Sequence, residues 1–173
     1  NARAEPSGSV GVSVEETPDD ASGTLVSIAC YAFPAEDVGF EECLAGDNSP
    51  DEPGWFIQWL QERCPGSAFT FEEAWFDIGT PESYLEAVAW ALDGECVVAE
   101  DATVTDSDLG ENVHVMSGAT VEHSTVQSSV VFPDASVVDC EVHDSIIDRE
   151  THVANLDLAG ALIGAHSHIA NGR

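Results

Sequence analysis

The sequence predicts an α/β segment followed by a triangular β-solenoid, in which short parallel strands wind into stacked coils. Before Asp93, apolar runs alternate with turn residues and with helical spacing. After Asp93, single aliphatic residues recur every five or six positions, and equivalent positions return at a nearly constant step, as in the series Val104, Val121, Val137, Val153 and Ile169. This step is the period of a solenoid, because each coil repeats the same few strands and corners.

Three stretches before the repeats give the first part its α/β character. Residues 9–16 alternate valine with small polar residues, which predicts a strand with one buried face. Residues 25–33 form a continuous apolar run, which is typical of a strand buried on both faces. Residues 55–63 place three large apolar side chains on one side of a short helix, and Pro65 stops that helix.

A second helix is predicted within the stretch from Trp75 to Ala87, which reads WFDIGTPESYLEA. The aromatic residues that lead into it favour a strand. Thr80 fits the N-cap and Pro81 the first helical position, where a missing N–H costs nothing. Asp77 lies in the turn between them, so we expect a carboxylate at a strand end beside a helix start. Such a place suits a metal ion, although an aspartate in a turn commonly serves the turn alone.

The repeats from residue 94 onward follow one pattern, with a single aliphatic residue of each short strand pointing inward. The aliphatic positions are Val98, Val104, Leu109, Val115, Val121, Val126, Val131, Val137, Val142, Ile147, Val153, Leu158, Ile163 and Ile169. A small residue lies two positions before the second aliphatic residue of each set, at Ala102, Ala119, Ala135, Thr151 and Ser167. The pattern resembles the hexapeptide repeats of a left-handed parallel β-helix, with four full coils and a partial fifth.

The charge balance is strongly acidic. Thirty-three carboxylates oppose four cationic side chains, all arginine, for a net charge of −29. Since 43% of the residues are hydrophobic and patterned, the chain is not an acidic disordered tail. A folded chain of this kind resembles proteins of salt-accumulating halophiles, in which concentrated salt screens self-repulsion. Nucleic acid is excluded as a partner, because no basic patch is available to neutralise phosphates.

Cysteine usage and the lack of targeting patterns indicate a cytoplasmic protein. The five cysteines are far apart, odd in number and without a C-x-x-C pair, which favours reduced thiols over disulfides or structural zinc. No apolar run has the length of a membrane helix, so we expect no membrane partner. Met116 is the only methionine, so we expect residue 1 to lie inside a longer reading frame.

The stretch from Trp75 to Ala87 resembles the D-x-G-T-P-x-x-Y-L-x-A segment of the sugar-1-phosphate nucleotidyltransferases. The repeats that follow resemble those members with a C-terminal left-handed β-helix, and the haloarchaeal glucose-1-phosphate thymidylyltransferases are the most similar group. The resemblance implies that residues 1–93 are the sugar-binding part of a Rossmann-like nucleotidyltransferase domain and residues 94–173 the β-helix. It also implies transfer of a nucleotidyl group from dTTP to glucose 1-phosphate with release of pyrophosphate, and a homo-oligomer formed through the β-helix.

The same resemblance assigns the site residues. Asp77 matches an aspartate that holds Mg²⁺ together with a second aspartate. Glu16 and Thr17 stand where the family has E-K-P, so Glu16 would receive sugar hydroxyls while Thr17 brings no charge to the sugar phosphate. Ser27 and Ala29 stand where the family has the asparagine and glycine of V-N-T-G-I-Y, so Ala29 narrows the sugar pocket.

Features that the chain lacks leave other functions open. The glycine-rich G-G-x-G-T-R-L signature and the partner aspartate do not occur, so we expect no catalytic residue in this chain and no turnover by it alone. A non-catalytic assembly or regulatory subunit is one alternative. A hexapeptide-repeat acyltransferase with a histidine base is another. His166 and His168 would share one face of a strand, but exposed histidines there are far more often plain surface residues.

Overall fold

The computed structural model describes residues 27–34, 39–46, 53–64 and 66–172. The chain divides into two compact units, residues 1–73 and residues 74–173, and each is described by itself. The strand predicted at residues 9–16 lies outside the described residues. None of the helices in the described part of the chain is long and apolar enough to span a membrane.

The first unit contains two short helices, α1 (Phe40–Leu44) and α2 (Pro53–Gln61). Helix α2 confirms the helix predicted at residues 55–63, although it begins and ends slightly earlier. Phe56, which lies on α2, stacks on Phe40 of α1 with ring centroids 3.9 Å apart. A small apolar core of four buried residues forms around this contact: Cys43, Phe56, Ile57 and Leu60.

The strands predicted at residues 25–33 and in the aromatic approach to Asp77 are wrong for the described residues. Residues 27–34 contain no strand, and residues 66–80 contain only an isolated bridge at Ser67. Ala29 has a φ of 55°, which interrupts an extended backbone. A strand also requires a neighbouring strand, and an apolar run by itself does not supply one. The α/β remnant of a Rossmann-like domain is therefore not confirmed.

The second unit begins with α3 (Pro81–Leu92), which confirms the predicted helix start. Thr80 is the N-cap, and its side-chain oxygen accepts a hydrogen bond from the backbone N–H of Ser83. Ser83 returns the contact to the backbone of Thr80, so the two residues form a capping box. Asp93 ends the helix in the left-handed conformation with φ 49°, and the chain then enters the first coil.

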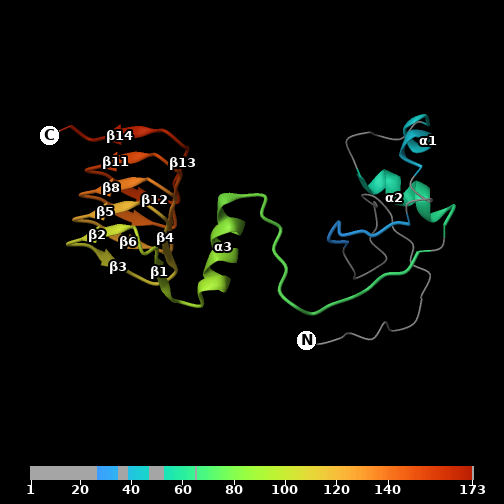
Figure 1. The fold of residues 1–173 in the computed structure, drawn as a ribbon, viewed down its shortest axis with the longest axis horizontal. Coiled ribbons are helices and arrows are strands. Elements are labelled where there is room, and N and C mark those ends of the chain that lie inside the picture. Colours follow the sequence, from blue (N-terminus) through green and yellow to red (C-terminus); the bar gives the residue numbers. More distant parts are fainter. Residues whose placement is uncertain (1–26, 35–38, 47–52, 65, 173) are drawn as a thin grey trace. The chain divides into compact units, whose positions relative to one another are not determined.

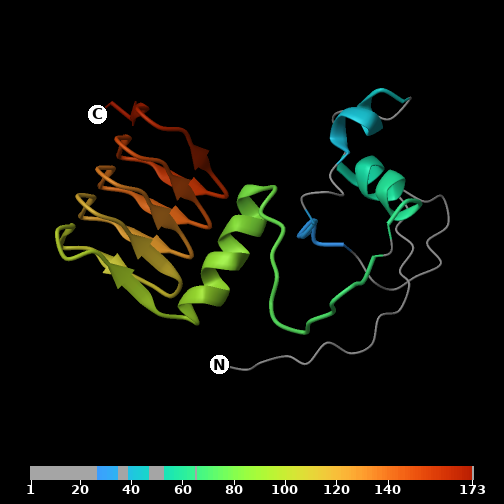
Figure 2. The same ribbon diagram turned by 45° about the vertical axis from the view of Figure 1, so that its right-hand side comes forward.

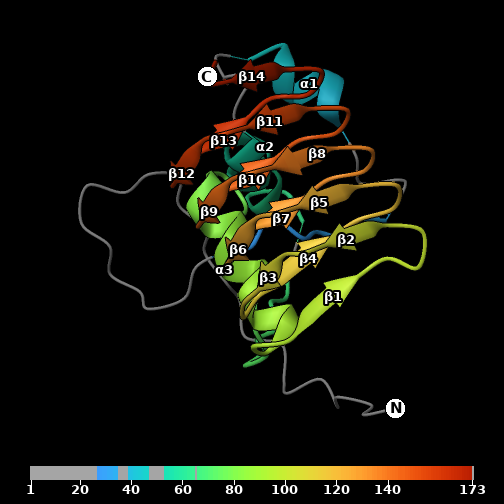
Figure 3. The ribbon, with the colours of Figure 1, turned by 90° about the vertical axis from the view of Figure 1, so that its left-hand side faces the viewer.

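Fourteen short strands form a parallel β-helix of about five coils, with three sheets as its sides (Figure 3). The first sheet contains β1 (Cys96–Val98), β4 (Val113–Val115), β7 (Val130–Val131), β10 (Ile146–Ile147) and β13 (Leu162–Ile163). The second sheet contains β2 (Thr103–Thr105), β5 (Thr120–Glu122), β8 (Ser136–Val138), β11 (His152–Ala154) and β14 (His168–Ala170). The third sheet contains β3 (Asp108–Leu109), β6 (Thr125–Gln127), β9 (Glu141–His143) and β12 (Asp157–Ala159).

The strand register confirms the repeat seen in the sequence. Val104 pairs with Val121, and Val121 pairs with Val137 in the following coil. The same step continues from Val137 to Val153 and on to Ile169. The predicted inward residues of the middle coils are fully buried in one continuous core. The core opens at both ends of the β-helix, where Val98 is 40% and Ile169 is 39% exposed.

Buried hydroxyl groups pair with the backbone at the corners between the strands. Ser145 donates a hydrogen bond to the carbonyl oxygen of His143 (2.6 Å) and accepts one from the N–H of Ala161 in the next coil (3.0 Å). Ser129 lies one coil earlier and accepts a hydrogen bond from the N–H of Ser145 in the same way. Each coil is thereby tied to the next through groups that would otherwise be buried without a partner.

Helix α3 lies along the first sheet (Figures 1 and 2). The ring of Tyr84 on this helix is 6.2 Å from the ring of Phe132, which follows β7. Val130 and Ile146 point away from the β-helix core, yet Val130 is fully buried and Ile146 is 7% exposed. The helix thus covers an apolar outer face, which explains why β7 and β10 are apolar at successive positions instead of alternating.

Candidate functional site

The start of α3 places several polar groups together, just after Asp77. The Ser83 hydroxyl accepts hydrogen bonds from the N–H groups of Gly79 (3.2 Å) and Thr80 (3.1 Å). The pKa of Glu82 is lowered, first by a hydrogen bond from its own backbone N–H and then by the Thr80 hydroxyl. The backbone N–H groups at the start of α3 that have no partner within the helix therefore donate hydrogen bonds to side chains of the same turn.

Asp77 itself is exposed and lies in an irregular segment, not at a strand end. Its carboxylate is a hard oxygen donor, which suits Mg²⁺. Within the described residues, no three side chains among His, Cys, Asp and Glu form a group that could hold a metal ion. The described part of the chain thus offers one carboxylate at this position and no complete set of metal ligands.

The predicted sugar-pocket residues are described only in part. Glu16 and Thr17 lie outside the described residues. The Ser27 hydroxyl is 2.7 Å from the Tyr31 hydroxyl, and it accepts a weaker hydrogen bond from the N–H of Ala29 (3.3 Å). Ala29 has a left-handed backbone, a conformation that glycine adopts without strain. Ser27 and Ala29 belong to the first compact unit and Asp77 to the second.

The second sheet carries a histidine pair that the sequence analysis missed. His152 and His168 are paired in register on β11 and β14, and their rings stack with centroids 4.7 Å apart. The pair expected from the sequence was His166 with His168, but His166 lies on a corner with a φ of 61°, not on a strand. The signal that could have found the true pair is the repeat itself, because His152 and His168 are separated by the same single coil as Val153 and Ile169.

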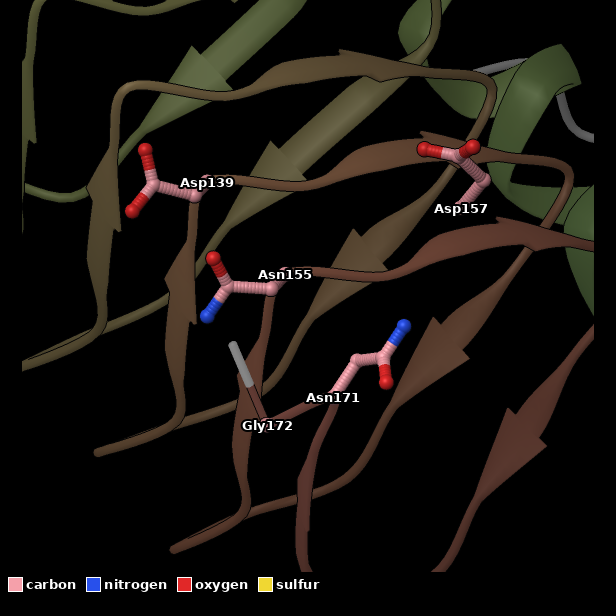
Figure 4. Close-up of a pocket in the computed structure, with 5 residues that line it drawn as sticks. All are labelled: Asp139, Asn155, Asp157, Asn171 and Gly172. Atoms are coloured by element: carbon pink, nitrogen blue, oxygen red, sulfur yellow. The ribbon is translucent and has the colours of Figure 1, made fainter.

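A shallow pocket of about 290 Å³ lies at the corner between the second and third sheets (Figure 4). Asp139, Asn155 and Asn171 occupy equivalent corner positions in successive coils, and Asp157 and Gly172 complete the lining. Asp139 and Asn155 have φ angles of 52° and 56°, a left-handed conformation that short polar residues tolerate. These residues therefore serve the turns of the β-helix.

Comparison with known proteins identifies the β-helix and the helix that precedes it. The family described as GlmU-like, C-terminal hexapeptide matches residues 79–168, which is more than half of the chain. No curated protein compared with the chain is similar enough to count as a match. The family match supports the left-handed β-helix of hexapeptide repeats and links the chain to transferases. The chain belongs to the GlmU-like C-terminal hexapeptide family.

Proposed function

We propose that this chain is the C-terminal portion of a sugar-1-phosphate nucleotidyltransferase from a salt-accumulating organism. The enzyme would join a nucleotide, from dTTP, to glucose 1-phosphate and release pyrophosphate. The observation that carries the proposal is the stretch from Trp75 to Ala87, which resembles the nucleotidyltransferase segment and leads directly into the β-helix. The packing of α3 on the first sheet supports it, because helix and β-helix form one compact unit.

Exposed apolar side chains on α3 and on the segment before it also support the proposal. Trp75, Ile78 and Trp90 are 48%, 56% and 64% exposed, and the ring of Trp90 contacts that of Phe76 at 5.6 Å. Large apolar side chains that gather on a surface commonly mark a contact with another segment or domain. We infer that the nucleotide-binding part of the catalytic domain covers these side chains in the complete enzyme.

In this proposal Asp77 supplies one carboxylate ligand of Mg²⁺. Mg²⁺ held there would supply positive charge to neutralise the phosphate oxygens of the substrates. Glu16 would accept hydrogen bonds from sugar hydroxyls, and the Thr17 hydroxyl would donate one to the sugar phosphate. Ser27 and Ala29 would line the sugar pocket. All of these residues bind or orient a ligand, and none transfers a proton.

The test of the proposal is pyrophosphate release from dTTP and glucose 1-phosphate, measured with Mg²⁺ in molar KCl. The complete enzyme should release pyrophosphate only when both substrates are present. This chain alone should release none. Dynamic or static light scattering under the same salt conditions would measure the homo-oligomer that we expect to form through the β-helix.

A second candidate function is acyl transfer with a histidine base, and the pair of half-buried His152 and exposed His168 on the second sheet favours it. The uninterrupted coils from β1 to β14 oppose it, because no extended loop is present there to bind a long cofactor. Release of free thiol from an acyl-thioester would decide in its favour. A third candidate, a non-catalytic assembly subunit, would show neither activity in the complete assembly.

A further inference from the structure

The histidine pair on the second sheet presents two imidazole rings side by side. His152 lies on β11 and His168 on β14, and the two residues are direct partners in the parallel register. Their ring planes differ by 19°, with centroids 4.7 Å apart. The lone pair of an imidazole nitrogen lies in the plane of its ring, so both side chains must rotate out of this stack to bring one nitrogen of each onto a single ion.

A hydrogen bond fixes the orientation of one of the rings. Nδ1 of His152 is 3.1 Å from the hydroxyl oxygen of Ser136, which is its register partner on β8. When Nδ1 carries the proton, it donates to Ser136, and Nε2 keeps its lone pair for a ligand. A hydrogen bond of this kind to the second ring nitrogen is the usual support of a metal-binding histidine.

The pair also differs from the neighbouring histidines in its surroundings. Three other histidines have a carboxylate within ion-pair distance, as in His143 with Glu141 (3.0 Å) and His166 with Glu150 (3.3 Å). Among the described residues, no carboxylate lies within that distance of His152 or His168. Imidazole nitrogens without carboxylate oxygens select ions such as Zn²⁺, Ni²⁺ and Cu²⁺ over Mg²⁺ and Ca²⁺. The net charge of −29 raises the local concentration of any cation.

We propose that His152 and His168 form a two-histidine site for a divalent transition-metal ion. The site has two protein ligands in the described part of the chain, so water fills the remaining positions and the ion exchanges readily. It joins β14, the last strand of the β-helix, to β11 in the coil before it. Ile169 on β14 is 39% exposed, so this end of the core is open, and a bound ion would hold the last coil in place.

The test is a titration of the EDTA-treated whole chain with Ni²⁺ in molar KCl with excess Mg²⁺. Calorimetry measures the binding. The Mg²⁺ occupies surface carboxylates, so only a nitrogen-selective site is measured. One saturable Ni²⁺ site is expected. His152→Gln and His168→Gln should each weaken binding by about tenfold or more, and Ser136→Ala should weaken it by about tenfold through loss of ring orientation. Hydrogen exchange of β14 amides should slow on Ni²⁺ addition in the unchanged chain only.

His143→Gln is the matched control, since it removes a half-buried histidine that is paired with Glu141. It should leave Ni²⁺ affinity unchanged. Both ring substitutions lie on an outer face, and circular dichroism would verify that each variant remains folded. Equal Ni²⁺ affinity in His168→Gln and the unchanged chain would overturn the proposal. So would the absence of a saturable site, or a loss of affinity in His143→Gln alone.

Discussion

The ring of Tyr84 on α3 lies 6.2 Å from the ring of Phe132, where β7 turns the corner of the β-helix. This contact joins the segment that resembles a nucleotidyltransferase to the hexapeptide repeats. Beside it, Val130 and Ile146 are buried on the outside of the β-helix. The helix and the first sheet therefore stabilise one another, and the candidate Mg²⁺ ligand Asp77 lies close before that helix in sequence.

Tyr84→Ala should lower the melting temperature, because it removes an aromatic contact and exposes the apolar outer face of β7 and β10. We expect a loss of about 1–3 kcal/mol in the free energy of unfolding. Tyr84→Phe is the control, since it keeps the ring and should lose much less. Thermal unfolding followed by circular dichroism measures both. If the two variants melted alike, α3 would not depend on this ring.

Tyr84 should lose its proton at a higher pH than is usual for tyrosine. Partial burial raises the pKa of Tyr84 above its usual value of 10.0. Because this pKa is higher in the folded state, the protonated form of Tyr84 contributes to the free energy of unfolding. The contribution is complete below the unfolded-state pKa and is lost as the pH rises through the folded-state pKa. Ultraviolet difference titration of the unchanged chain and of Tyr84→Phe should show that the ionisation with the raised pKa vanishes in the variant. If that ionisation persisted in Tyr84→Phe, the raised pKa would not belong to Tyr84.

Val137→Asp should unfold the β-helix, whereas Val138→Asp should be tolerated. Val137 points into the core and is fully buried, while its neighbour Val138 faces outward on β8 and is only half-buried. An unpaired carboxylate in the narrow core should cost about 4 kcal/mol or more. Melting curves and solubility measurements of the two variants compare the inward position of Val137 with the outward position of Val138. Equal melting temperatures would contradict the assigned register.

Ser145→Ala should destabilise the β-helix although it changes a single oxygen. The substitution leaves the N–H of Ala161 without its partner and removes the bond to the carbonyl of His143. A buried group left unpaired costs about 1–3 kcal/mol. Cys140→Ser is the control, because serine can donate to the same carbonyl of Val138 that the thiol contacts at 3.1 Å. Urea unfolding should show a lower free energy of unfolding for Ser145→Ala and an unchanged one for Cys140→Ser.

The parts of the fold that were predictable are those specified by neighbours in sequence. Thr80 and Ser83 form a cap within one turn, and Val121 and Val137 repeat at the period of a coil, so both could be inferred locally. The strand expected at residues 25–33 could not, because strand formation depends on partners that an apolar run does not identify. The doublet of Val130 and Val131 held a signal that was missed, since it predicts burial on both faces of β7.

Less of the candidate site was predictable. The contact between His152 and His168 arises from the register of the coils, and closeness in sequence drew attention to His166 instead. The left-handed corners are filled by short polar residues such as Asp139 and Asn155, so glycines alone do not mark them. Asp77 was predicted as a metal ligand from a resemblance, and that role stays a prediction because the described residues supply no partner ligand.

Stability should rise steeply with salt. Thirty-three carboxylates face four arginines, so most charges on the surface repel one another. The screening length is about 30 Å at 0.01 M salt and about 3 Å at 1 M, which leaves the repulsion almost unscreened in dilute buffer. Melting temperatures in dilute buffer and in molar KCl should differ widely. Equal values would remove the inference that the protein comes from a salt-accumulating organism.

The most direct test of the central claim is pyrophosphate release by the complete enzyme carrying Asp77→Asn. Asparagine keeps the shape of the side chain and removes one anionic ligand of Mg²⁺. We expect kcat to fall by about 10² or more, as when one electrostatic contact to the transition state is lost. Asp93→Asn, at the far end of α3, is the control and should remain active. An Asp77→Asn enzyme as fast as its parent would contradict the account, as would pyrophosphate release by this chain alone.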